Sequence, residues 1–322
     1  MIYNHSYDAL RNVQFRGKPR DMIYLGVELE LEVDRGPQAK MPADYTYPVG
    51  YRASCTCTEC LQDYWRNHEG LGLVIRTDQS VANEVVKLLG EDFAIIKHDG
   101  SLGYGIEIVS APASLVVHRK RWPKLFAEMG EHGLKAEPSC GMHVHVSKEP
   151  FDLEHLGLMP AFITEPANRK FVVDVAGREK PDWASMEKKI PAAAKHIACA
   201  NRYGNTCPEC AANRELRIAK YQAVNLAKPK TAEFRIFAST TDQHRFFTNL
   251  EFAASVARYC RNVLKPEAPD FRYQAYLAWL SNEDYPELKQ FLTVNQYLPV
   301  PPVVPLPSNK RSVRLASAPL PA

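Results

Sequence analysis

The sequence has no apolar run near the roughly 20 residues that a membrane helix requires. Its first segment, MIYNHSYDALRNVQFRGKPR, lacks the apolar core of a signal peptide. Neither sign of charge is in large excess: 40 Lys and Arg against 37 Asp and Glu give +3, too little to indicate nucleic acid as the main partner. The glycine-rich patterns GxGxxG and GxxxxGK[ST] are absent, so a nucleotide would have to bind without such a phosphate loop. We therefore expect a cytoplasmic protein that binds neither membranes nor nucleic acid.

The remaining composition is that of a globular protein, with 45% hydrophobic and 24% charged residues. Alternation of apolar and polar residues predicts strands at 22–33, 93–97, 104–110, 141–147, 219–226 and 231–238. Longer periodic segments predict helices at 77–89, 114–131, 153–200 (with interruptions) and 242–263, with more helix after 271. Because the strands come in neighbouring pairs with helices grouped between them, we predict an α+β fold with a largely antiparallel sheet.

This pattern predicts a single domain over residues 1–298, since no internal repeat or second periodic unit is present. Two Cys-containing segments, at about 34–70 and 199–213, break the regular pattern and are interpreted as insertions. Residues 299–322 contain many prolines and are predicted to form a flexible, extended tail.

The first predicted strand carries acidic residues at alternate positions. In GVELELE, residues Glu28, Glu30 and Glu32 share one face, with neighbouring side chains about 7 Å apart, twice the rise per residue. A row of like charges is unfavourable unless solvent or a cation compensates it, and Mg²⁺ prefers carboxylate oxygens. The strand is therefore either a metal platform or a solvated amphipathic surface.

Two later strands carry further candidates. Glu107 lies between two isoleucines in GIEIVS, and Asp99 lies on the turn before it. In GMHVHVS, His143 and His145 share a strand face. A lone histidine is most often structural, but a pair at i and i+2 favours a metal or phosphate site.

The strand AEFRIFAST places Glu233 and Arg235 on one face. Such a pair is either a structural ion pair or a metal ligand beside a phosphate-binding arginine. Four strand faces that all carry groups of this kind are harder to explain as solvated surface than any one of them.

Eight cysteines in a protein without a secretory signal point to metal ligands or reactive thiols before disulfides. Cys57 and Cys60 form one CxxC unit, and Cys207 and Cys210 form another. Two such units commonly build a tetrahedral Zn²⁺ site, which would join the two insertions near the mouth of the active site. Cys55 and, as a weaker candidate, Cys199 are alternative ligands. A redox pair or unrelated free thiols are the other interpretations.

The ordered motifs GVELE, DGS…GIEIVSxP, CGMHVHVS and YxxVN…AEFRxF resemble the amidoligase family over about residues 22–260. That family is related to glutamate–cysteine ligase and glutamine synthetase. The resemblance implies their architecture, with metal-binding carboxylates on one face of an antiparallel sheet and helices packed on the other.

The resemblance also implies roles for individual residues. The ligands of Mg²⁺ (or Mn²⁺) would be Glu28, Glu30, Glu107 and Glu233. The catalytic groups would be Asp99, His143 and Arg235.

Nucleotide-binding groups form a third set. The resemblance places His145, Asn225 and Arg235 near the nucleotide. Lys220 follows the second Cys unit and is a further candidate for a phosphate contact, with ordinary surface charge as the alternative.

The implied activity is ATP-dependent joining of a carboxylate to an amine through an acyl phosphate. The substrates would be a small-molecule or peptide carboxylate and an amine, with ATP, Mg²⁺ and a structural Zn²⁺ as cofactors. One alternative is a phosphotransferase that acts on a nitrogen acceptor. The other is a non-catalytic, zinc-stapled binding or virion-type structural protein, in which the acidic site would be broken.

Overall fold

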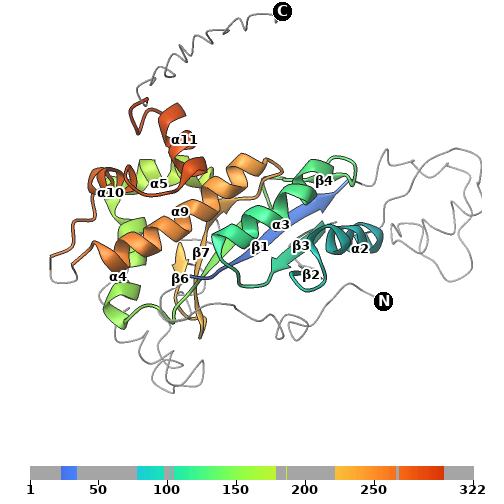
Figure 1. Ribbon diagram of the computed structural model, residues 1–322, viewed down its shortest axis with the longest axis horizontal. Helices are drawn as coiled ribbons and strands as arrows, with labels where there is room; N and C mark the ends of the chain where they lie inside the picture. The colour runs from blue at the N-terminus through green and yellow to red at the C-terminus, as the bar shows by residue number, and fades with distance from the viewer. Residues whose placement is uncertain are drawn as a thin grey trace, which may run out of the picture.

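The computed structural model describes residues 23–34, 78–97, 102, 105–178, 186, 222–265 and 268–300. Within this part of the chain the strands form one seven-stranded sheet, in the order β2-β3-β1-β5-β7-β6, with β4 paired to β1. The strands are β1 (Leu25–Val33), β2 (Ala94–Lys97), β3 (Gly105–Ser110), β4 (Leu134–Lys135), β5 (Gly141–Ser147), β6 (Val224–Asn225) and β7 (Thr231–Ala238). Figure 1 shows this sheet crossed by helices.

The central strand β1 explains the two faces of the sheet. Its odd-numbered residues, Leu25, Val27, Leu29, Leu31 and Val33, are buried in the hydrophobic core. The glutamates occupy the alternate positions and therefore lie on the opposite face. Every strand pairing described is antiparallel, which confirms the predicted sheet type.

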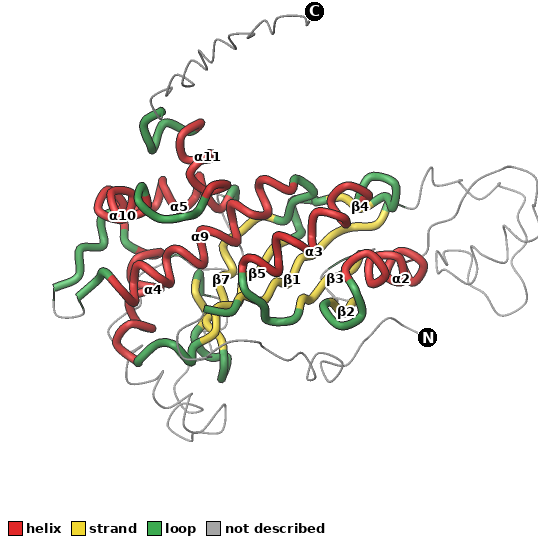
Figure 2. Tube along the Cα trace, in the orientation of Figure 1, coloured by secondary structure: helices red, strands yellow, loops and turns green. Residues whose placement is uncertain are grey.

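The helices pack on the apolar face and against one another. They are α2 (Asp78–Leu89), α3 (Leu115–Glu128), α4 (Leu153–Thr164), α5 (Arg169–Ala176), α9 (Gln243–Asn262), α10 (Tyr273–Leu280) and α11 (Pro286–Val294), with a short 3₁₀ helix at Pro166–Asn168. The longest, α9, contacts β5, α3, α4 and α11, and Figure 2 shows it running beside the strands with α3. Asn249 on α9 donates to the Met142 sulfur on the core face of β5, so α9 covers the face opposite the glutamates.

The predicted elements recur with modest changes in length. Strand β1 begins at Leu25, three residues later than predicted, and β6 is limited to Val224–Asn225. The helix α3 continues through Pro123, as the predicted helix at 114–131 requires. Proline cannot donate a backbone hydrogen bond, and the complete burial of the neighbouring Trp122 and Leu125 side chains offsets this loss. The pair of residues in β4 had no alternating pattern long enough to predict.

An irregularity between β5 and β7 bears on the site. Met142 pairs with Phe237 whereas Val144 pairs with Phe234, so β7 has one more residue than β5 in this stretch. A bulge of this kind redirects side chains locally and is common next to functional sites. The bulge lies between Glu233, which pairs with His145, and the C-terminal end of β7.

The predicted domain limits include segments outside the described residues, namely both Cys-containing insertions and the tail. Among the helices of the described part, none is long and apolar enough to cross a membrane.

Candidate metal centre

The polar face of the sheet gathers residues from six strands into three neighbouring rows. The first row pairs Lys97, Glu107 and Glu30. The second pairs Glu28 with His143. In the third, His145 pairs with Glu233, and Glu233 with Asn225.

Glu28 lies between the two histidines. Its Oε2 is 3.1 Å from His143 Nδ1, and its Oε1 is 3.2 Å from His145 Nε2. Burial favours the neutral carboxyl, but the hydrogen bond with His143 and the charges of both histidines outweigh burial and hold the pKa of Glu28 well below its ordinary value. Glu28 is therefore a carboxylate at neutral pH, as a metal ligand must be.

His145 is oriented from behind by Thr231. Its Nδ1 is 3.0 Å from the Thr231 hydroxyl oxygen, so Nε2 faces the carboxylates. This Nε2 is buried and, although 3.2 Å from Glu28 Oε1, makes no hydrogen bond of acceptable geometry to any described group. A hydrogen bond on one ring nitrogen, with the other nitrogen left free to face a cation, is the usual arrangement of a metal-ligating histidine.

Glu233 is fully buried and is held by two donors. Asn225 Nδ2 donates to its Oε2 at 2.7 Å, and Arg235 Nη1 donates to its Oε1 at 2.5 Å. His143 Nδ1 lies 3.6 Å from the same Oε1. A buried carboxylate requires such partners, because removing a charge from water costs several kcal/mol.

The first row extends the acidic surface. Glu30 and Glu107 lie directly opposite each other, and less than a tenth of the surface of each is exposed. The Gly141 amide donates to Glu30 Oε2 at 2.6 Å. Lys97 flanks Glu107 on β2; burial lowers the lysine pKa, while the charges of Glu107 and Glu28 act to raise it.

A second cation approaches from the end of α5. Gly177 terminates this helix in the left-handed conformation, with φ of 69°, and Arg178 follows it. A Cβ atom on Gly141 would lie 3.1 Å from Arg178 Nη1, 3.4 Å from Glu30 Oε2 and 3.6 Å from His143 Nε2. These three side chains therefore converge on the α-carbon of Gly141.

Eight of the predicted site residues share this face: Glu28, Glu30, Glu107, His143, His145, Asn225, Glu233 and Arg235. The other predictions fall outside the described residues, namely Asp99, Lys220 and the cysteines Cys57, Cys60, Cys207 and Cys210. The zinc site thus stays a prediction.

Two cations of the face were not predicted. Lys97 ends the apolar segment AIIK, and its position opposite Glu107 depends on strand register. The only sign in the sequence was the strand alternation, which places Lys97 on the same face as Ile95. Arg178 reaches the site through the geometry of the α5 end, for which the sequence offers no pattern.

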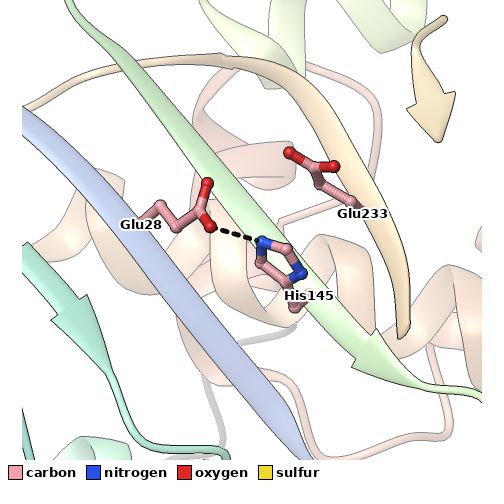
Figure 3. A group of neighbouring side chains, drawn as sticks. All are labelled: Glu28, His145 and Glu233. Atoms are coloured by element: carbon pink, nitrogen blue, oxygen red, sulfur yellow. Dashed lines mark ion pairs between the residues drawn. The ribbon is translucent and has the colours of Figure 1, made fainter. Parts of the chain in front are cut away.

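The residues present fit a divalent cation. One ligand atom each from Glu28, His145 and Glu233 lie within 4.8 Å of one another, and Figure 3 shows the three side chains converging from β1, β5 and β7. Two carboxylates with one imidazole suit Mn²⁺ at least as well as Mg²⁺, which prefers oxygen ligands throughout. The buried His145 Nε2 supports this assignment independently of the carboxylates.

A family model described as "Putative amidoligase enzyme" matches residues 25–257, which contain all eight residues of the face. This chain belongs to the amidoligase family. The match confirms the resemblance stated from the motifs and supports an enzyme of the ligase type. A search of curated proteins finds no match to this amidoligase.

Proposed function

We propose that this amidoligase joins a carboxylate to an amine at the expense of a nucleoside triphosphate, bound with a divalent cation on the Glu28–His145–Glu233 face. The observation that carries the proposal is the convergence of these three side chains within 4.8 Å. We also propose that the fold is like that of glutamine synthetase and glutamate–cysteine ligase. The antiparallel sheet with its acidic face supports this part of the proposal.

The proposed reaction has two steps. A carboxylate oxygen of the acid attacks the γ-phosphorus of ATP, and the bond to the leaving ADP breaks. The amine nitrogen then attacks the acyl carbon, the C–O bond to phosphate breaks, and phosphate leaves. The proton released by the amine passes to a carboxylate of the face acting as general base.

The residues of the face supply positioning and charge. A divalent cation, when bound, would neutralise phosphate charge and orient the transferred group. Arg235 holds Glu233 in place and adds positive charge beside it. Lys97 at one side of the acidic face and Arg178 near Gly141 provide cations at its margins, where the anionic phosphates and the acid would lie.

Calorimetric titration of ATP with Mg²⁺ or Mn²⁺ tests the proposal. We expect cation-dependent binding by the wild type that is lost in Glu28→Gln and Glu233→Gln. Glu84→Gln, on the exposed surface of α2, is the control and should bind like the wild type. Absence of binding by a folded wild type would contradict the proposal.

Phosphate release separates the ligase from a phosphotransferase acting on nitrogen. A ligase releases phosphate rapidly only when both an acid and an amine are present. A phosphotransferase instead consumes ATP with the nitrogen acceptor alone and forms a phosphorylated product. Screening acids and amines in pairs, with each omitted in turn, distinguishes the two.

A further inference from the structure

A large cavity lies beside the metal centre, at the end of the sheet where Ser147 and Thr231 pair. Its volume is about 1130 Å³, slightly above the roughly 300–1,000 Å³ typical of small-molecule sites. Residues just before β1, at the end of β5, at the start of β7 and at the start of α4 line it, among them Tyr24, Ser147, Phe151, Leu156 and Thr231.

The cavity continues the rows of the polar face. The amide of Tyr24 donates to the Ser147 hydroxyl oxygen at 3.0 Å, and Ser147 pairs with Thr231. These residues are two positions along their strands from the row that holds His145 and Glu233, a step of about 7 Å. Thr231 belongs to both regions, because its hydroxyl contacts His145 Nδ1.

One wall of the cavity is fixed by a buried lysine. Lys148 Nζ donates to the carbonyl oxygens of Leu226 at 2.6 Å and Lys228 at 2.7 Å. The Lys148 amide donates to the carbonyl of Lys230. These bonds tie the connection between β6 and β7 to the end of β5, so that this wall is already formed in the structure.

From this placement we propose that the cavity binds the base and ribose of the nucleoside triphosphate. The inference rests on the proposed function. Apolar and aromatic residues such as Phe151 and Leu156 suit a neutral planar base. Three carboxylates at the cavity, from Glu149, Asp152 and Glu154, outnumber its two lysines, Lys148 and Lys230, and disfavour a phosphate or an acidic substrate there.

The reach of the ligand also favours a nucleotide. A group in the cavity lies about 7 Å or more from Glu233, two residues along the strand. A ligand that fills both the cavity and the metal centre must span this distance. In a nucleoside triphosphate, the ribose and two phosphates separate the base from the γ-phosphate. A small acid or amine that reacts at the centre has no comparable second part to fill the cavity.

A filling substitution on an exposed lining residue tests this assignment. Leu153, the first residue of α4, lines the cavity and is 38% exposed, so Leu153→Trp narrows the cavity without enlarging a core side chain. Val116→Trp on α3, at a position 59% exposed and outside the cavity lining, is the matched control. Binding of ATP and of inorganic triphosphate, each with Mn²⁺, is measured by calorimetry.

We expect Leu153→Trp to weaken ATP binding about tenfold or more while triphosphate binding stays unchanged. Val116→Trp should bind both ligands like the wild type. Equal weakening of both ligands, or no effect on ATP, would overturn the nucleoside assignment. A wild type that binds triphosphate and ATP equally well would also overturn it, whereas a wild type that binds neither contradicts the proposed function itself.

Discussion

Gly141 and Glu30 meet across β5 and β1, where the glycine amide donates to the carboxylate at 2.6 Å. A Cβ on Gly141 would crowd Arg178 Nη1 at 3.1 Å and make ordinary contact with this carboxylate and with His143. The glycine φ is not in the left-handed region, so the constraint comes from the approach of side chains and not from the backbone.

We expect Gly141→Ala to weaken cation-dependent ATP binding by about tenfold, since displacing functional groups from position costs of the order of 1–2 kcal/mol. Thermal unfolding should change little, because the crowded atoms are the ends of flexible side chains. Gly130→Ala is the control, since its Cβ would meet nothing within 4 Å. Unchanged ATP binding by Gly141→Ala would contradict the expected crowding.

Divalent cations should stabilise the fold through the proposed centre. Binding to the native state alone contributes about 2.7 kcal/mol at a free concentration 100 times the dissociation constant. We therefore expect Mn²⁺ to raise the Tm of the wild type but not of His145→Ala. His155→Ala removes an imidazole that pairs with exposed Asp152 on α4 and should keep the response. An equal Mn²⁺ response in His145→Ala would place the cation elsewhere.

Arg235 should stabilise the fold chiefly through Glu233. Arg235→Met leaves the fully buried carboxylate without its cationic partner, which costs about 3 kcal/mol or more when a buried pair is broken. Combining it with Glu233→Gln removes the charge and should restore much of the loss. Urea unfolding of the two single variants and the double variant measures the coupling. Strict additivity would show that the pair contributes nothing beyond its separate parts.

His118 should make stability fall in mild acid. Burial lowers the pKa of this histidine from 6.5 to about 4. Its Nδ1 accepts from the Trp122 indole N–H and its Nε2 donates to the Leu25 carbonyl, so the folded protein holds the neutral ring. Between pH 6.5 and 4 the unfolded chain binds the extra proton, and stability is lost as the pH falls through that window, by about 3 kcal/mol.

Urea unfolding at a series of pH values checks this effect. In His118→Gln, an amide can still donate to Leu25 and accept from Trp122, but it does not titrate. The pH dependence between 6.5 and 4 should therefore be smaller than in the wild type. Parallel pH profiles for the two proteins would rule out His118 as the source.

The sequence predicted the carboxylates and histidines of the site, but not the cations and the cavity that surround them. Strict alternation in β1 fixes which side chains share a face, so Glu28 and Glu30 could be assigned before any register was known. That Glu233 would meet His145, and Glu30 would meet Glu107, required the strand order and register. Short-range patterns carry no information on pairings between distant segments.

Lys97, Arg178 and the cavity illustrate the remaining gap. Lys97 becomes part of the site only through its pairing with Glu107. Arg178 is brought there by a helix end that Arg245 holds, through bonds to the carbonyls of Asp174 and Val175. The cavity depends on where α4 begins relative to the strand ends, a property of tertiary packing that the sequence pattern does not encode.

The strand order has a consequence for how the protein is made. The hydroxyl of Ser239 bonds the carbonyl of Glu30, 209 residues earlier in the chain, and β5 separates β1 from β7 in the sheet. Pairing between such distant segments forms late, because a long loop must close first. A nascent chain still lacking β7 carries Glu28 and His145 but cannot place Glu233 beside them. Loading of the proposed cation would thereby be restricted to chains whose synthesis has passed β7, and an incomplete product would lack the complete site proposed for ATP.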